Sequence, residues 1–135
     1  RYRYADGTYP SNTAKTIDGQ VYRFDADGYM RTGWVFEQGS WYYHAPSGAQ
    51  ATGWVLNGVS WYYLTPGTGQ MATGWVKDGA HWYYLNPANG KMKTGWHYED
   101  GSWYYLKPGS GQMATGRLWI VWKYYRFSDN GTLIR

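Results

Sequence analysis

The feature that most constrains the fold is a repeat of about twenty residues. The dipeptide Gly-Trp recurs at residues 33–34, 53–54, 74–75 and 95–96, in steps of 20, 21 and 21. The tripeptide Trp-Tyr-Tyr keeps the same step, at residues 41–43, 61–63, 82–84 and 103–105. A period of this length is typical of architectures in which each repeat is one supersecondary unit that packs only on its neighbours.

Each repeat predicts a β-hairpin followed by a loop. Gly, aromatic and β-branched residues disfavour helix, and short apolar runs around Asn-Gly or Asp-Gly are typical of hairpins with two-residue type I′ turns. Such turns would place the two Trp of a repeat directly opposite each other. Two repeats have this arrangement: Trp54 and Trp61 flank Asn57-Gly58, and Trp75 and Trp82 flank Asp78-Gly79.

The other two central repeats carry their glycine one residue later, at Gly39 and Gly101, which predicts a bulged or longer turn. Alternation along the strands places Tyr63 on the face of Trp54 and Trp61 and sends Tyr62 to the other face. The first Tyr of each triplet is the expected core residue, at Tyr42, Tyr62, Tyr83 and Tyr104.

A lone two-stranded hairpin is marginally stable in water, so the repeats must stack and bury aromatic faces against one another. The predicted fold is therefore an all-β solenoid of stacked hairpins, with 20 to 21 residues per repeat. We expect residues 1–20 to be a remnant of a preceding repeat or a linker, because the chain starts at Arg1 and "YRYADG" resembles "YRFDADG" further on. The repeat domain is expected at 21–135, with central repeats at 33–52, 53–73, 74–94 and 95–115 and a capping repeat at 116–135.

Composition limits the partners. No run approaches the roughly 18 apolar residues of a membrane span, and there is no Cys for a disulfide or a thiolate metal site. The net charge of +4 comes from 13 scattered Lys and Arg, which do not interleave regularly with the Trp as single-stranded nucleic acid would require. With 10 Trp and 16 Tyr, the chain has more indole rings than thin hairpins can bury, so partly exposed Trp pairs are expected to form open aromatic boxes.

The segment "TGWVKDGAHWYYLNPANGKMKTGW", residues 73–96, resembles the repeat of the choline-binding modules, the cell-wall-binding repeats of Gram-positive murein hydrolases and phage lysins. The resemblance covers nearly the whole chain, although Gln50 replaces the Met of the trailing motif once. It implies cages between consecutive hairpins, each walled by the Gly-Trp indole, the Trp of Trp-Tyr-Tyr and the second Tyr of the next repeat. The implied sites are Trp34, Trp41 and Tyr63; Trp54, Trp61 and Tyr84; and Trp75, Trp82 and Tyr105.

A fourth cage would begin with Trp96 and Trp103, and its third wall would be Tyr125 or Phe127. No cage is expected in the last repeat, where Arg117 and Tyr124 stand at the two Trp positions. Trp119 and Trp122 are out of step with the repeat and are expected to serve capping or partner contacts.

The resemblance implies a non-catalytic, secreted or surface-associated targeting module of a larger cell-wall hydrolase, or of a phage lysin. It would bind choline groups of teichoic acid through cation-π contacts at several cages, without a cofactor, and could pair as a homodimer through its C-terminal end. The alternative is a glucan-binding or other glycan-binding repeat, to which the two end segments are closer.

Enzymatic and metal-dependent functions find little support in the sequence. Most of the nine acidic residues occupy turn positions rather than the paired arrangement that a glycosidase needs. His44, His81 and His97 do not share a repeat position or metal-ligand spacing. Met71, Met92 and Met113 precede Gly-Trp or its equivalent and are expected either to pack beneath the boxes or to touch ligand.

Overall fold

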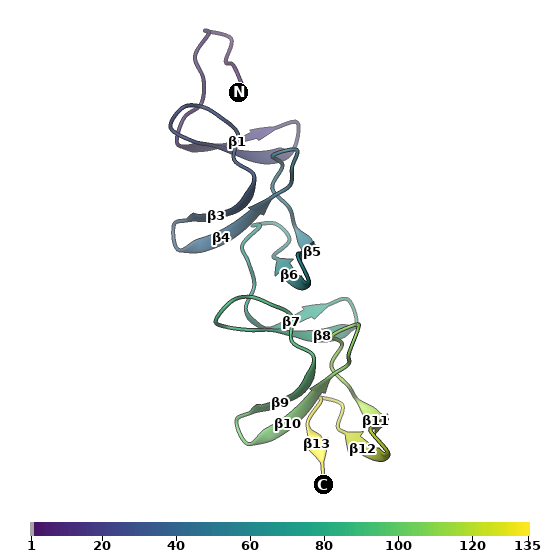
Figure 1. Ribbon diagram of the computed structural model, residues 1–135. Helices are drawn as coiled ribbons and strands as arrows, with labels where there is room; N and C mark the ends of the chain where they lie inside the picture. Colours follow the sequence, from purple (N-terminus) through teal and green to yellow (C-terminus); the bar gives the residue numbers. More distant parts are fainter. Residues whose placement is uncertain (1) are drawn as a thin grey trace. The chain divides into compact units, whose positions relative to one another are not determined.

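The computed structural model describes residues 2–135, and it is all-β: no helix occurs in that range. This confirms the predicted fold class of repeated β-hairpins (Figure 1). The strands are β1 (Thr13–Ile17), β2 (Gln20–Phe24), β3 (Gly33–Glu37), β4 (Ser40–His44), β5 (Gly53–Asn57), β6 (Ser60–Leu64), β7 (Gly74–Asp78), β8 (His81–Leu85), β9 (Gly95–Glu99), β10 (Ser102–Leu106), β11 (Gly116–Ile120), β12 (Lys123–Phe127) and β13 (Leu133–Ile134).

Every hairpin has strands of five residues joined by a two-residue turn. The longer turns predicted at Gly39 and Gly101 were therefore wrong. At these two places Gln38-Gly39 and Asp100-Gly101 both have positive φ at each residue, which is the type I′ pattern. The repeat spacing is unchanged because these turns differ from the other hairpin turns in sequence and backbone conformation but not in length.

The second and third central repeats use the other favoured hairpin turn. Gly58 and Gly79 stand first in their turns with positive φ, followed by Val59 and Ala80, which matches the Gly-first pattern of type II′. The sequence pairs Asn57-Gly58 and Asp78-Gly79 suggested type I′ turns one residue earlier, and that prediction was wrong.

The shifted turn changes which side chains face each other across the hairpin. In β7–β8, Trp75 lies opposite Tyr84, and Trp82 lies opposite Lys77. The two Trp are thus diagonal neighbours on one face rather than a direct pair. Their common face follows from alternation, as predicted, because residues 75 and 77 point the same way.

The first hairpin, β1–β2, is complete and pairs over Thr13–Phe24 with the same register as the others. The expected start of the repeat domain at residue 21 therefore falls inside its second strand. At the other end, β13 adds a third strand beside β12 and also lies against β10 (Figure 1). β13 thereby widens this sheet to three strands.

Consecutive hairpins are joined by backbone hydrogen bonds and by a recurring side-chain contact. The amide of Met71 donates to the Trp41 carbonyl, and that of Met113 donates to the Trp82 carbonyl, each at 2.8 Å. The methionine side chain then fills a space that only glycine leaves open, since a Cβ at Gly111 would overlap the sulfur of Met92. Each loop is thereby held on the repeat before it.

The residues that end the second strands, next to the loops, are consistently buried. Leu64, Leu85, Leu106 and His44 are fully buried there, and Val35 in the middle of β3 and Ala114 are fully buried as well. The Tyr residues expected in the core are only half-buried: Tyr42, Tyr62, Tyr83 and Tyr104. Turn ends stay open to solvent, whereas strand ends next to the loops are covered on both faces.

Contacts divide the chain into two compact units. The N-terminal unit runs to Asn57 and includes Tyr63–Met71, and the C-terminal unit comprises Gly58–Tyr62 and Ala72–Arg135. In the C-terminal unit the last core cluster consists of Ala114, Ile120 and Phe127, with Trp96 and Tyr105 packed against it.

Candidate functional site: aromatic cavities between hairpins

A cavity lined by aromatic rings lies in the C-terminal unit, between the hairpins β7–β8 and β9–β10. It measures about 310 Å³ and is lined by Trp75, Trp82, Tyr104, Met113 and Asn130. Three aromatic rings and a thioether surround it, and no charged side chain lines it. Trp82 keeps 39% of its surface exposed, so the cavity is open to ligand.

The third aromatic wall is Tyr104 and not Tyr105, which differs from the sequence-based assignment. The ring centroids of Trp75 and Tyr104 are 5.0 Å apart, whereas Tyr105 packs on Trp96 of its own hairpin at the same distance. Alternation explains the difference: Tyr105 shares a face with Trp96, so its neighbour Tyr104 must point to the opposite face, toward the preceding hairpin.

Polar side chains behind the cavity orient the Trp75 indole. Its Nε1-H donates to Glu99 Oε2 at 3.0 Å, and the other carboxylate oxygen lies 3.2 Å from His97 Nε2. The hydrogen bond from Trp75 is the main reason that the pKa of Glu99 is held below its ordinary value. Burial, reinforced by the Glu99 charge, raises the pKa of Tyr84, whose ring lies 4.0 Å from that of His97.

A second aromatic cleft is built around the fourth Gly-Trp. Trp96 and Trp103 meet edge to face at 6.2 Å and line a cleft of about 390 Å³ together with Leu133 and Arg135. Both candidates for the third wall lie near Trp96: the centroid of Tyr125 is 5.0 Å away and that of Phe127 is 6.0 Å away. The side chains that complete this cleft come from β13 and from Arg135 after it.

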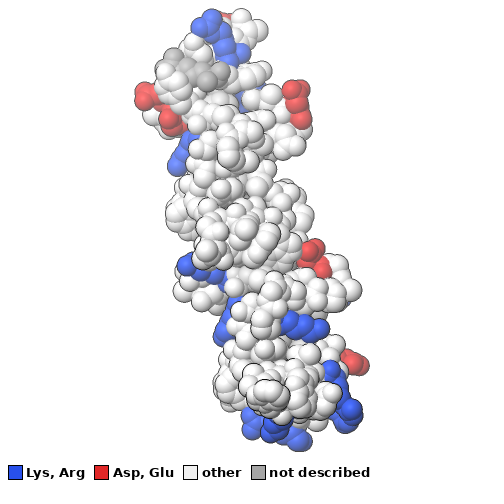
Figure 2. Space-filling view, turned by 45° about the vertical axis from the view of Figure 1, so that its right-hand side comes forward, with Lys and Arg blue, Asp and Glu red and all other residues white. Residues whose placement is uncertain are grey.

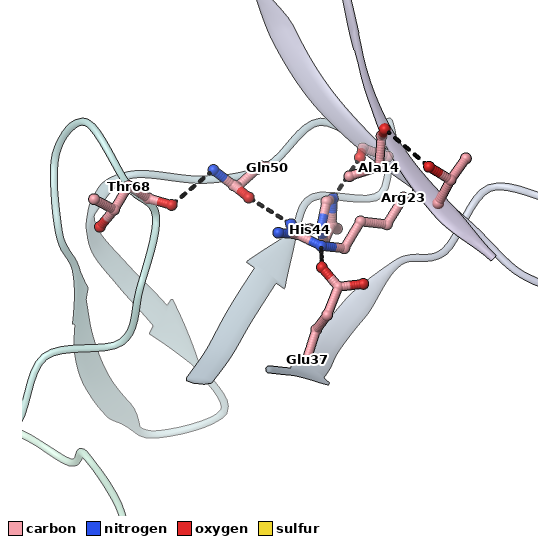
Figure 3. A network of polar contacts seen from close by, with 8 residues as sticks. Ala14, Arg23, Glu37, His44, Gln50 and Thr68 are labelled. Atoms are coloured by element: carbon pink, nitrogen blue, oxygen red, sulfur yellow. Dashed lines mark hydrogen bonds and ion pairs between the residues drawn. The ribbon is translucent and has the colours of Figure 1, made fainter. Parts of the chain in front are cut away.

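At the first hairpin junction, in the N-terminal unit, the side chain of Arg23 packs on an aromatic ring. Its guanidinium carbon lies 3.9 Å from the ring centroid of Tyr42. Arg23 also donates to Glu37 at 2.8 Å, contacts His44 Nε2 at 3.0 Å and donates to Gln50 (Figure 3). Burial lowers the pKa of His44, whose Nδ1 lies 2.7 Å from the Gly48 carbonyl, so the neutral ring accepts from Arg23.

The remaining predicted cage residues are partly assembled within each unit. Trp34 and Trp41 lie 6.4 Å apart at an interplanar angle of 87°, the arrangement also found for Trp96 and Trp103. Tyr63 is buried and packs on Trp54 of its own hairpin at 4.9 Å, and Tyr84 packs likewise on Trp75 at 5.1 Å. Trp61 is 38% exposed.

The last hairpin presents aromatic rings without an enclosing wall. Trp119 and Tyr124 pair across the strands at 4.6 Å on an exposed face, and Trp122 is 86% exposed in the turn. Val121 and Trp122 both have positive φ, an unusual conformation for a β-branched and for a bulky residue.

Within residues 2–135, no three His, Asp or Glu side chains gather as metal ligands. That part of the chain also contains no helix long and apolar enough to cross a bilayer.

The chain is thus a repeat protein of stacked aromatic hairpins, with ring-lined cavities beside the hairpins of its C-terminal unit. A family model described as the choline-binding repeat matches residues 12–48, 38–73 and 72–118. The chain therefore belongs to the choline-binding repeat family, as the resemblance in its sequence implied.

Solved structures agree with this assignment. The chain is similar to CbpJ from Streptococcus pneumoniae TIGR4 (41% identity over 90% of this chain and 41% of that chain, TM-score 0.86). It is also similar to choline binding protein F of S. pneumoniae, solved in the presence of a peptidoglycan analogue (40% identity, 90% and 40% coverage, TM-score 0.84). The modular autolysin LytC of S. pneumoniae, in complex with a synthetic peptidoglycan ligand, matches at 30% identity (96% and 29% coverage, TM-score 0.76).

The chain spans less than half the length of each of these three relatives. None of the curated protein sequences compared with it matches.

Proposed function

We propose that the chain binds choline groups through cation-π contacts in its aromatic cavities. The observation that carries this proposal is the cavity of Trp75, Trp82 and Tyr104, which offers three rings and no charge. A quaternary ammonium has no N-H to satisfy and is weakly hydrated, so ring faces suit it better than hydrogen-bonding groups would. Met113 adds a polarisable contact at the base of the same cavity.

One cavity gives weak binding. Three rings at about 0.5–2 kcal/mol each contribute about 2–6 kcal/mol before the entropic cost of association, so one site binds with a dissociation constant of about a millimolar. Several such sites facing a polymer with many choline groups bind far more tightly together, because each bound site raises the effective concentration at the next. The repeat is therefore part of the proposed mechanism.

The proposed biological role is non-catalytic targeting of a larger cell-wall hydrolase, or of a phage lysin, to choline-bearing teichoic acid outside the cell. Membership of the choline-binding repeat family and likeness to an autolysin support this role. In this proposal residues 21–135, extended by the first hairpin, form the binding domain. A homodimer through the C-terminal end stays a prediction.

The test is a titration of choline and, separately, of glucose oligomers, followed by Trp fluorescence and near-UV circular dichroism at two salt concentrations. A saturable change at millimolar choline, absent with the sugars, is the expected result. A response to the sugars alone would replace the proposal with glycan binding. Choline binding should change little between the two salt concentrations, since no charged side chain lines the Trp75 cavity.

A further inference from the structure

The last hairpin, β11–β12, exposes two apolar side chains at its turn. Val121 and Trp122 form this turn, and they are 81% and 86% exposed. The turns of the five preceding hairpins each pair a glycine with Asp, Gln, Val or Ala. The turn of the last hairpin therefore differs from the others in presenting an indole ring and an isopropyl group together to solvent.

The backbone of this turn has a conformation that its side chains disfavour. The φ angle is 42° at Val121 and 68° at Trp122. A β-branched residue and a bulky one rarely adopt positive φ, whereas Asn-Gly fits the same type I′ geometry without strain. Packing within residues 2–135 does not explain the choice of Val and Trp, because both side chains are exposed. Strained positions of this kind are concentrated at functional sites.

Behind the turn, one face of the hairpin carries an aromatic pair and then a cationic pair. Trp119 and Tyr124 are cross-strand partners, and their ring centroids lie 4.6 Å apart. Two residues farther from the turn, Arg117 and Arg126 are partners. Alternation places both pairs on the same face, and all four side chains are exposed. A step of two residues along a strand covers about 7 Å, so the face has successive apolar, aromatic and cationic layers.

The cationic pair replaces an aromatic one and has no carboxylate partner. The equivalent pair in β7–β8 is Trp75 and Tyr84. Like charges directly opposite each other cost stability, and neither arginine takes part in an ion pair within residues 2–135. Residues 116–135 contain four basic side chains and one carboxylate, a formal charge of +3 compared with +4 for the whole chain. Figure 2 shows Lys and Arg side chains (blue) gathered at the lower end, which is the C-terminal end in Figure 1.

We propose that the turn of the last hairpin inserts into an anionic lipid surface. Val121 and Trp122 enter the boundary of the acyl chains, to the depth of about 5–10 Å that interfacial segments reach. Trp119 and Tyr124 then lie at the level of the interface, which aromatic rings prefer. Arg117 and Arg126 reach the lipid phosphates, where basic side chains are attracted by the surface potential.

The shape and charge of the hairpin favour this partner over two others. A two-residue turn is convex, so it cannot enclose a peptide, whereas a fluid lipid surface can take it up. A second copy of the same face would bring positive charge against positive charge. The inference goes beyond choline binding, because none of these six side chains lines the Trp75 cavity or the Trp96 cleft.

The experiment measures co-sedimentation of the full chain with vesicles of phosphatidylethanolamine and phosphatidylglycerol, at a high and a low share of phosphatidylglycerol. Neither lipid carries choline, and free choline is added throughout so that the aromatic cavities do not contribute. We expect affinity to rise about 10-fold or more with the share of phosphatidylglycerol, and Trp fluorescence to shift to shorter wavelength on binding.

The first variant is Val121→Asn/Trp122→Gly, which gives the turn the Asn-Gly sequence that type I′ geometry favours. The variant should therefore unfold at the same temperature as the wild type or at a higher one. Its vesicle affinity should fall about 10- to 100-fold, because two apolar side chains no longer insert. The matched control is Val59→Asn, at a turn residue 98% exposed in a hairpin without Lys or Arg, and it should keep its affinity within about twofold.

The second variant, Arg117→Gln/Arg126→Gln, tests the cationic layer. It removes a like-charge pair, so the fold should be at least as stable as that of the wild type. Its affinity for vesicles rich in phosphatidylglycerol should fall about 10- to 30-fold, and the dependence on phosphatidylglycerol should weaken. The control Lys91→Gln, at an exposed cation outside the last hairpin, should keep that dependence.

Three outcomes would overturn the inference. Vesicle binding retained by Val121→Asn/Trp122→Gly would show that the turn does not insert and that the cations bind any polyanion. An equal loss in Val59→Asn would show a general effect of surface apolarity. A wild-type dimer in sedimentation velocity without lipid, abolished by Val121→Asn/Trp122→Gly, would assign this face to a second copy of the chain.

Discussion

The hairpin junctions at Arg23 and at Trp75 have the same backbone arrangement but differ in the side chains between the two hairpins. In the N-terminal unit, Ala14 and Val21 stand at the two Trp positions, and Arg23 covers Tyr42 from within the chain. In the C-terminal unit, Trp75 and Trp82 stand there, and the ring of Tyr104 faces an open cavity. An internal cation therefore lies at the first junction, whereas the second has an open cavity, which receives an external cation in the proposed function.

The same glutamate position serves both junctions. Glu37 and Glu99 each end the first strand of the second hairpin. Glu37 accepts from the guanidinium of Arg23, and Glu99 accepts from the indole of Trp75. At both junctions the carboxylate accepts a hydrogen bond from a donor of the preceding hairpin, a guanidinium in one case and an indole in the other.

The largest expected effect is the loss of the internal cation. Arg23→Ala should destabilise the N-terminal unit by about 2–4 kcal/mol, because it leaves His44, Glu37 and Gln50 without their shared donor. Native-state hydrogen exchange of the β3–β4 amides measures this change. The matched control Arg31→Ala, at an exposed arginine, should change stability by less than about 0.5 kcal/mol. Equal effects of the two variants would show that Arg23 is not a structural cation.

The next largest effect is expected on ligand affinity at the junction around Trp75. Tyr104→Leu should weaken choline binding at the Trp75 indole about 3- to 30-fold, since one cation-π wall is lost. Tyr105→Leu should leave that affinity within about twofold and shift the Trp96 signal instead. Site-specific NMR titration measures the affinity of both variants. A larger loss of affinity at Trp75 with Tyr105→Leu than with Tyr104→Leu would show that Tyr105 is the third wall of the cavity.

A smaller effect is the pH dependence of stability at the junction around Arg23. Since burial lowers the pKa of His44, the unfolded chain binds a proton more readily, and stability should fall as pH drops below about 6.5. The slope is at most about 1.4 kcal/mol per pH unit. His44→Leu should flatten this dependence, because leucine holds the same position in the next three hairpins. Replacing the exposed His81 with Gln should leave the slope unchanged.

The smallest effect concerns the carboxylate of the open junction. Folding lowers the pKa of Glu99, so the Glu99 carboxylate stabilises the folded chain above the ordinary Glu pKa of about 4.5. This stabilisation is lost as pH falls through the lower pKa that Glu99 has in the folded chain. The Trp75 indole signal should titrate with a midpoint below 4.5. Glu99→Gln should abolish that titration; a midpoint at or above the ordinary value would exclude the hydrogen bond as its cause.

The sequence predicted the hairpins and their period, because strict repetition leaves few foldable alternatives. It did not predict the turn register, since Asn57-Gly58 as a type I′ turn and Gly58-Val59 as a type II′ turn both satisfy the local preferences, and the structure has the second. That error did not cause the misassignment of Tyr105: alternation between Trp103, Tyr104 and Tyr105 already separates the two tyrosines onto opposite faces.

Some site residues had no signal in the sequence. Asn130 reaches the Trp75 cavity from the last loop, and Arg135 reaches the Trp96 cleft from beyond β13, because the chain folds back beside the preceding repeat. Nothing in the sequence distinguishes Arg23 from the other scattered Lys and Arg, and only its burial against Tyr42 shows that it belongs to the core.

The wall supplied by Tyr104 has a consequence for how such chains can change in length. The Trp75 cavity draws its lining from three successive segments: the indoles from one repeat, Tyr104 and Met113 from the next, and Asn130 from the one after. One repeat is therefore shorter than the stretch of chain that lines one cavity. Deleting a terminal repeat should remove the wall of a cavity in the repeat before it, and an inserted repeat should form a new cavity only if its neighbours carry matching rings.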